Sequence, residues 1–159
     1  MIEETRDEGN DSIVNGNDYT ALFSYGLASN RMKKAQTGHQ AATTAYAYND
    51  RDQLTAEGAD ANSDGIPDPA TATTYAYDDN GSTVSKTIGA SVTAFIWDLR
   101  NRMVAVDAPG TANDATYSYD SDGVRVKEVT SSGTTYYLND PQNPTGYAKK
   151  LSQNTFLGR

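Results

Sequence analysis

The sequence predicts an all-β protein built as an array of antiparallel hairpins. Pairs of aromatic residues separated by one residue recur along the chain, and side chains two apart lie on the same face of a β-strand. Each pair is followed by a short run of turn-forming residues and then by a residue that starts a return strand. The second aromatic residues recur at intervals of 20 to 29 residues, which is typical of a repeat protein. No stretch has the 3.6-residue period of a helix over three turns.

The chain of 159 residues is long enough for one repeat array. Its 11 Tyr, 1 Trp and 3 Phe fall mostly at matched repeat positions, so we expect an aromatic ladder in place of an aliphatic interior. The absence of cysteine excludes disulfides and thiol chemistry. The net charge of −8, with basic residues running no longer than pairs, argues against a nucleic-acid partner. No apolar run is long enough to span a membrane.

Residues 1–18 are polar and charged, and we expect them to form a flexible N-terminal segment without a visible signal peptide. Residues 19–159 are expected to form the array. The first hairpin runs from Phe23-Ser24-Tyr25 to Met32, and the second from Tyr46-Ala47-Tyr48 to Leu54. An insertion at 57–74 then accounts for the longest interval between repeats.

Three further hairpins and a decayed copy follow the insertion. Their aromatic pairs are Tyr75/Tyr77, Phe95/Trp97, Tyr117/Tyr119 and Tyr136/Tyr137. Additional turns are expected around Gly89, at Ala108-Pro109-Gly110 and at Ser131-Ser132-Gly133. The residues expected to form the structural aromatic ladder are Tyr25, Tyr46, Tyr48, Tyr75, Tyr77, Phe95, Trp97, Tyr117, Tyr119 and Tyr137. The alternative use of such a ladder is to stack on the faces of sugar rings.

The segment Tyr117-Ser118-Tyr119-Asp120-Ser121-Asp122-Gly123-Val124-Arg125-Val126 resembles the YD repeat of the Rhs family, which also occurs in teneurins and in shell components of insecticidal toxin complexes. The residues from Tyr137 to Tyr147 are similar to the start of the Rhs-associated core region. The resemblance covers about residues 20–150. It implies an array of YD-repeat β-hairpins in one curled, spiral or solenoid-like sheet.

The same family repeat carries an arginine after its turn. Arg31, Arg102 and Arg125 occupy that position, whereas Gln53 and Thr83 replace it in two hairpins. Cations stacked over the tyrosine ladder are therefore expected only at these three arginines.

The insertion contains the sharpest chemical motif in the chain. Oxygen-bearing residues at positions 1, 3, 5 and 9 of a loop, with glycine at 6 and a backbone carbonyl at 7, match the spacing of a calcium loop. The expected ligands are Asp60, Asn62, Asp64, the Ile66 carbonyl and Asp68. Thr71 replaces the bidentate glutamate at position 12, which predicts a weak Ca²⁺ site, with a dissociation constant on the order of 10⁻⁴–10⁻³ M. The alternative is a solvated loop without an ion.

The resemblance implies a non-enzymatic structural module that forms part of a β-sheet shell wall in a secreted or cell-surface protein, around an encapsulated cargo polypeptide. One alternative is a subunit of an extracellular filament that polymerises head to tail by pairing its open β-edges with identical chains. Another is a calcium-dependent adhesin that binds a surface glycan. His39 is the single histidine and lies in a polar link, so no nucleophile with its general base is expected. The chain is compatible with a processed piece of a longer protein.

Overall fold

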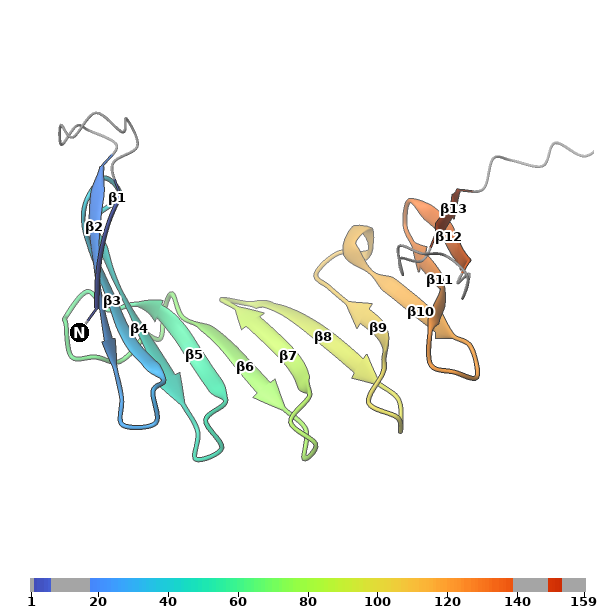
Figure 1. The fold of residues 1–159 in the computed structure, drawn as a ribbon, viewed down its shortest axis with the longest axis horizontal. Helices are drawn as coiled ribbons and strands as arrows, with labels where there is room; N and C mark the ends of the chain where they lie inside the picture. Colours follow the sequence, from blue (N-terminus) through green and yellow to red (C-terminus); the bar gives the residue numbers. More distant parts are fainter. Residues whose placement is uncertain (1, 7–17, 139–148, 153–159) are drawn as a thin grey trace, which may run out of the picture. The chain divides into compact units, whose positions relative to one another are not determined.

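The computed structural model of the chain describes residues 2–6, 18–138 and 149–152. These residues form strands and a single three-residue 3₁₀ helix, η1 (Figure 1). The strands are β1 (Ile2–Arg6), β2 (Tyr19–Tyr25), β3 (Arg31–Gly38), β4 (Ala42–Tyr48), β5 (Leu54–Ala59), β6 (Thr73–Tyr77), β7 (Thr83–Ile88), β8 (Ser91–Trp97), β9 (Met103–Asp107), β10 (Ala115–Tyr119), β11 (Arg125–Thr130), β12 (Gly133–Leu138) and β13 (Lys149–Ser152), with η1 at Thr111–Asn113. The prediction of an all-β hairpin array is confirmed.

The chain divides into two units, and within each the hydrogen-bonded order of the strands follows the order of the sequence. Unit 1 comprises residues 1–76 and 87–90, and unit 2 comprises residues 77–86 and 91–159. The boundary between the units therefore falls within β6 and β7. How the whole array curls remains a prediction.

Unit 1 holds strands β1 to β6, and each pairs antiparallel with the next. The segment that we expected to be flexible contributes β1, in which Ile2 faces Phe23 and Arg6 faces Tyr19 of β2. Residues 7–17 of that segment lie outside the described residues. The insertion is narrower than its expected bounds, because β5 continues to Ala59 and β6 begins at Thr73, which leaves a loop at 60–72.

In unit 2, strands β8 to β13 also pair antiparallel with their neighbours in the chain. The last described pair joins Leu138 of β12 to Lys149 of β13. The Rhs-core-like segment from Tyr137 to Tyr147 lies mostly outside the described residues, with only its first two residues in β12.

Small side chains make up most of the fully buried apolar residues that the structure describes. The buried core residues are four alanines, Ala21, Ala45, Ala72 and Ala115, and one tyrosine, Tyr46. Of the predicted ladder, Tyr46 is buried, Tyr25 is 46% exposed and the other eight residues are half-buried. The ladder was expected to form the interior, but the second aromatic residues Tyr48, Tyr77, Trp97 and Tyr119 are only half-buried. Their rings are only partly covered because the described residues form strands and the short η1 helix. The cover of each ring therefore comes from neighbouring side chains of the same sheet.

Candidate functional site

The aspartate of the repeat stabilises the hairpin turn. In four hairpins, the Oδ1 atom of the residue after the second aromatic accepts hydrogen bonds from the backbone N–H groups two and four residues later. For Asp120 the donors are Asp122 at 3.0 Å and Val124 at 2.9 Å. Asn49, Asp78 and Asp98 make the same pair of bonds. The side-chain oxygen of the Asp or Asn thereby satisfies N–H groups that a tight turn leaves without a backbone partner.

Each turn also needs one residue in the left-handed region. In the five turns that follow an aromatic pair, the fourth turn residue has a positive φ. These residues are Ser29 (65°), Asp52 (59°), Gly81 (87°), Asn101 (56°) and Gly123 (84°). The N–H of that residue donates to the carbonyl of the first turn residue, and the register shifts at the preceding strand end in four of the pairs. This is the geometry of a three-residue hairpin loop with an adjoining bulge. It explains why glycine, asparagine, aspartate or serine stands at that position.

The second aromatic of a repeat is bonded to the repeat before it. The Tyr48 hydroxyl donates to the Arg31 carbonyl at 3.0 Å. The Trp97 Nε1–H donates to the Thr83 carbonyl at 2.8 Å, and the Tyr119 hydroxyl to the Met103 carbonyl at 2.6 Å. In each case the acceptor is the first residue after the preceding turn. The sequence carried a signal for this contact, because the second aromatic is always Tyr or Trp, whereas Phe occurs at the first position.

The arginines stack as expected from the repeat. The Cζ atom of Arg31 lies 4.4 Å from the Tyr46 ring centroid, and that of Arg102 lies 4.7 Å from the Tyr119 centroid. Arg125 lies 4.9 Å from the ring of Tyr137 in the following strand. Each cation therefore contacts an aromatic ring of the next repeat, an arrangement that contributes about 0.5–1 kcal/mol at exposed sites.

Hydrogen bonds and burial shift the pKa of three groups on these hairpins. The Arg102 guanidinium contacts Asp98 Oδ2 at 2.7 Å, and this bond lowers the pKa of the Asp98 carboxyl. Burial raises the pKa of Tyr46. The Tyr137 hydroxyl donates to Glu128, and this bond raises the pKa of Tyr137.

The predicted calcium residues all belong to the loop at 60–72, but only one of them is buried. Asp60 is 1% exposed. Its Oδ2 atom accepts a hydrogen bond from the Gly65 N–H at 3.2 Å and lies 3.6 Å from Lys33 Nζ, while its Oδ1 atom is buried without a hydrogen-bond partner. Lys33 comes from β3, so the sequence spacing of the loop gave no sign of it.

The remaining loop oxygens bond within the loop. Asp64 Oδ2 accepts from Asn62 Nδ2 at 2.9 Å, and Asp64 Oδ1 accepts from the Ile66 N–H at 2.8 Å. Asp68 Oδ2 accepts from the Ala61 N–H at 3.0 Å. Asn62, Asp64 and Ile66 are exposed and Asp68 is half-buried. Within residues 2–6, 18–138 and 149–152, no three acidic, His or Cys side chains are gathered as a metal-binding group.

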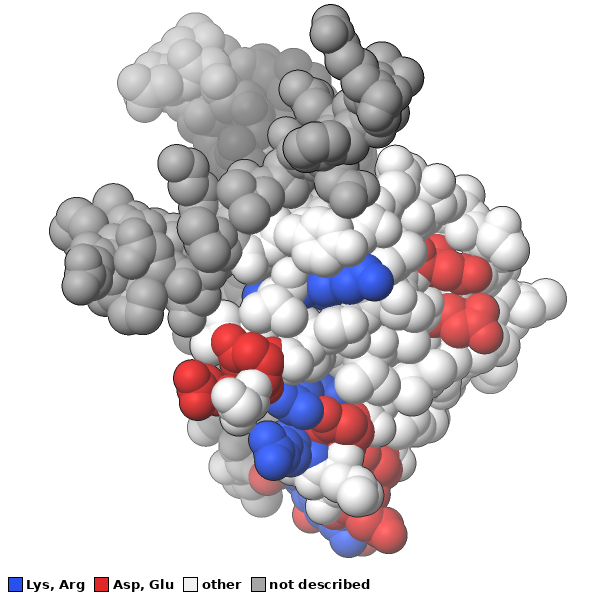
Figure 2. Space-filling model, turned by 90° about the vertical axis from the view of Figure 1, so that its right-hand side faces the viewer, with Lys and Arg blue, Asp and Glu red and all other residues white. Residues whose placement is uncertain are grey.

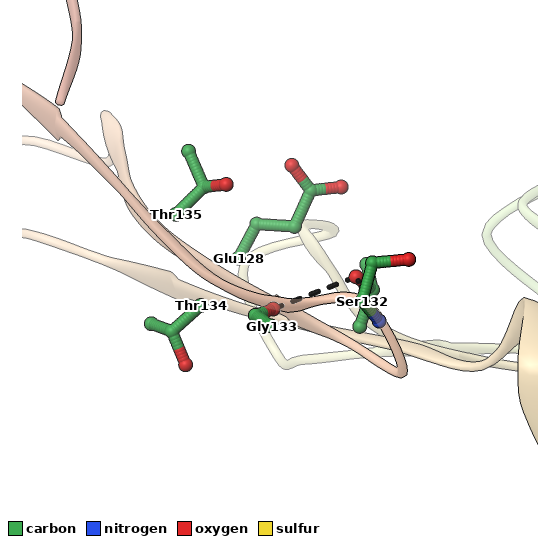
Figure 3. A pocket seen from close by; sticks show the side chains of 6 residues that line it. Glu128, Ser132, Gly133, Thr134 and Thr135 are labelled. Atoms are coloured by element: carbon green, nitrogen blue, oxygen red, sulfur yellow. Dashed lines mark hydrogen bonds between the residues drawn. The ribbon is translucent and has the colours of Figure 1, made fainter. Parts of the chain in front are cut away.

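A shallow recess of about 330 Å³ lies at the hairpin that β11 and β12 form. It is lined by Glu128, Thr130, Ser132, Gly133, Thr134 and Thr135. Figure 3 shows Glu128 and Thr135 on one side of the hairpin and Thr134 on the other. The Thr130 hydroxyl is engaged with the Gly133 carbonyl at 3.4 Å and the Glu128 carboxylate with Tyr137. The polar groups therefore do not converge on one point.

Charges of both signs are interleaved on the face drawn in Figure 2, mainly in its lower part, beside a largely uncharged surface. Asp98 and Arg102 form an ion pair between side chains four residues apart. In the part of the chain that the structure describes, no helix is long and apolar enough to cross a membrane.

Comparison with solved structures reveals a shared fold. The chain is similar to parts of the crystal structures of TcdB2-TccC3-Cdc42 and of TcdB2-TccC3 without its hypervariable C-terminal region, each with a TM-score of 0.58 and 13% identity over 79% of this chain. The structure of TcdB2-TccC3-TEV matches with a TM-score of 0.58 and 13% identity over 78% of this chain. The chain spans only 6–7% of the length of these proteins. Neither a protein-family model nor a curated protein matches the sequence.

Proposed function

We propose that this chain is a non-enzymatic wall segment of an Rhs/YD-type shell, in a secreted or cell-surface protein that encloses a cargo polypeptide. The observation that carries the proposal is the coupling between successive hairpins. One repeat supplies a backbone carbonyl and an arginine, and the next repeat supplies the aromatic residues that contact them. Such coupling between nearest neighbours stabilises a sheet that is extended by adding repeats.

The likeness to the solved TcdB2-TccC3 structures supports the same proposal at the level of the fold, because it extends over 79% of this chain. The thin apolar core favours a wall over an independent globular enzyme, since enclosed catalytic pockets need several layers of packed structure. The polar groups of the recess in unit 2 do not form a nucleophile with its base.

Light scattering and negative-stain electron microscopy of the purified chain test the proposal. A wall segment gives a monodisperse particle of defined size, and linking additional repeats of the same kind to both ends gives a longer curved or hollow particle. Fibres that lengthen with protein concentration would overturn the wall in favour of a filament. A protease-protection assay on a polypeptide fused to the extended array then tests enclosure of cargo.

A head-to-tail filament is the second candidate, because β1 pairs with only one strand among the described residues. Its free backbone groups are able to pair with β13 of another copy. In an antiparallel strand, successive N–H groups point to opposite neighbours. Glu3→Pro and Glu4→Pro therefore remove N–H groups on opposite sides of β1. The variant that removes the N–H pointing away from β2 should abolish fibres, while the far-ultraviolet circular dichroism spectrum stays that of a β-protein. Fibres retained by both variants exclude this edge as the contact.

A further inference from the structure

The loop at 60–72 contains one buried carboxylate, that of Asp60, whose negative charge is only partly compensated. The side chain of Asp60 has no exposed area, and that of Lys33 is 31% exposed. The charged atoms Lys33 Nζ and Asp60 Oδ2 are 3.6 Å apart. Asp60 Oδ1 is buried and accepts no hydrogen bond. Burying a carboxylate oxygen without a hydrogen-bond partner lowers the stability of the folded state. Such an atom calls for an explanation, for example an ion bound at the site.

The position of Asp60 is fixed by the strands on either side of the loop. Its N–H donates to the Thr43 carbonyl of β4 at 3.1 Å, and the Asp68 N–H donates to the Ala59 carbonyl of β5 at 2.7 Å. The loop also closes over Gly58, since Ala72 Cα would lie 2.9 Å from a Cβ atom at that glycine. The first and ninth positions of the loop are thus held in place, whereas Asn62 and Asp64 are exposed and bond to each other.

We propose that this loop is a calcium site in which Ca²⁺ competes with the Lys33 ammonium group for Asp60. The ion takes the unpartnered Asp60 Oδ1 and the oxygens of Asn62, Asp64, Ile66 and Asp68, a set of oxygen ligands suited to a hard cation. The carboxylate of Asp64 must leave the Asn62 amide to bind, so the site forms fully only with the ion. Lys33 serves as the counter-charge when calcium is absent. This inference is independent of the proposed wall function.

The test measures thermal unfolding of the full chain with a chelator and with about 1–10 mM Ca²⁺, the range that saturates weak extracellular sites. Ca²⁺ should raise the midpoint of unfolding, because it binds the folded state only. Lys33→Met removes the competing cation. It should lower the midpoint in chelator and increase the calcium affinity roughly tenfold, as expected when one nearby like charge is removed. Asp60→Asn and Asp64→Asn should abolish the increment.

Asp122→Asn is the matched control, since Asp122 stands in an Asp-x-Asp-Gly turn outside the loop, and it should keep the full calcium increment. Asp64 is exposed, so Asp64→Asn folds and gives the decisive comparison if Asp60→Asn does not. The proposal is overturned if the wild type shows no calcium shift, or if the shift survives in Asp64→Asn. It is equally overturned if Lys33→Met binds calcium no more tightly than the wild type.

Discussion

The hydroxyl of Tyr119 donates a 2.6 Å hydrogen bond to the carbonyl of Met103, the first residue after the preceding turn. The ring of the same tyrosine lies 4.7 Å from the guanidinium carbon of Arg102. Two adjacent residues of one hairpin therefore contact one side chain of the next. Trp97 and Tyr48 make the corresponding hydrogen bonds at their own positions, which makes this contact a repeated connection between hairpins.

Replacing Tyr119 by Phe should lower the free energy of unfolding by about 1 kcal/mol, because the Met103 carbonyl loses its donor while the ring stays. Tyr117→Phe is the control. The Tyr117 ring lies 5.1 Å from Arg125, but the structure gives its hydroxyl no hydrogen bond among the described residues, so this change should cost less than about 0.5 kcal/mol. Urea unfolding followed by circular dichroism measures both. Equal losses in the two variants would contradict the role of the hydroxyl.

Asp120→Ala should destabilise the protein by about 1–2 kcal/mol, because the N–H groups of Asp122 and Val124 lose their side-chain acceptor. Asp122→Ala changes an exposed side chain of the same turn and should be close to neutral. Asp120→Asn keeps an Oδ1 acceptor, as Asn49 does in the second hairpin, and should recover most of the loss. An Asn variant as unstable as the Ala variant would show that the turn depends on charge instead.

The Asp98–Arg102 pair should make stability depend on pH in the acid range. Bonding to Arg102 lowers the folded pKa of Asp98 below its ordinary value of 3.8. The resulting stabilisation is present above pH 3.8 and is lost as the pH falls through the folded pKa. Asp98→Asn keeps an acceptor for the turn but removes the charge. Unfolding free energies from about pH 6 to about pH 2.5 should show the wild type losing its advantage over this variant. A difference that stays constant with pH would refute the assignment.

Gly58→Ala should destabilise unit 1 by about 1–3 kcal/mol, because the added methyl would lie 2.9 Å from the Ala72 Cα and backbone must shift. Gly26→Ala is the matched control. A Cβ atom at Gly26 would lie 3.4 Å from the Met32 side chain and 3.8 Å from the Asn30 carbonyl oxygen, and a methionine side chain moves easily. Thermal unfolding of the two variants compares them. A larger loss for Gly26→Ala would contradict the close seating of the 60–72 loop on β5.

Local chemistry made the hairpins predictable. The alternation of Tyr117 and Tyr119, the Asp120 that follows and the Gly123 with positive φ each act within about ten residues, so their pattern in the sequence was enough to locate strands and turns. The aromatic positions were predicted for the same reason, whereas the three stacking arginines were predicted from the resemblance to the family repeat. The extent of burial was not, because the cover of a ring depends on neighbours in other strands.

The sequence by itself determined the repeat, its turns and the oxygen spacing of the loop at 60–72, since these depend on short-range backbone geometry. Tertiary structure alone decided that Ile2–Arg6 pairs with β2, that Tyr119 reaches the Met103 carbonyl and that Lys33 lies beside Asp60. Lys33 and Asp60 are brought together only when β3, β4 and β5 pair in register. Contacts of this kind arise from long-range strand pairing, which no local pattern of residues encodes.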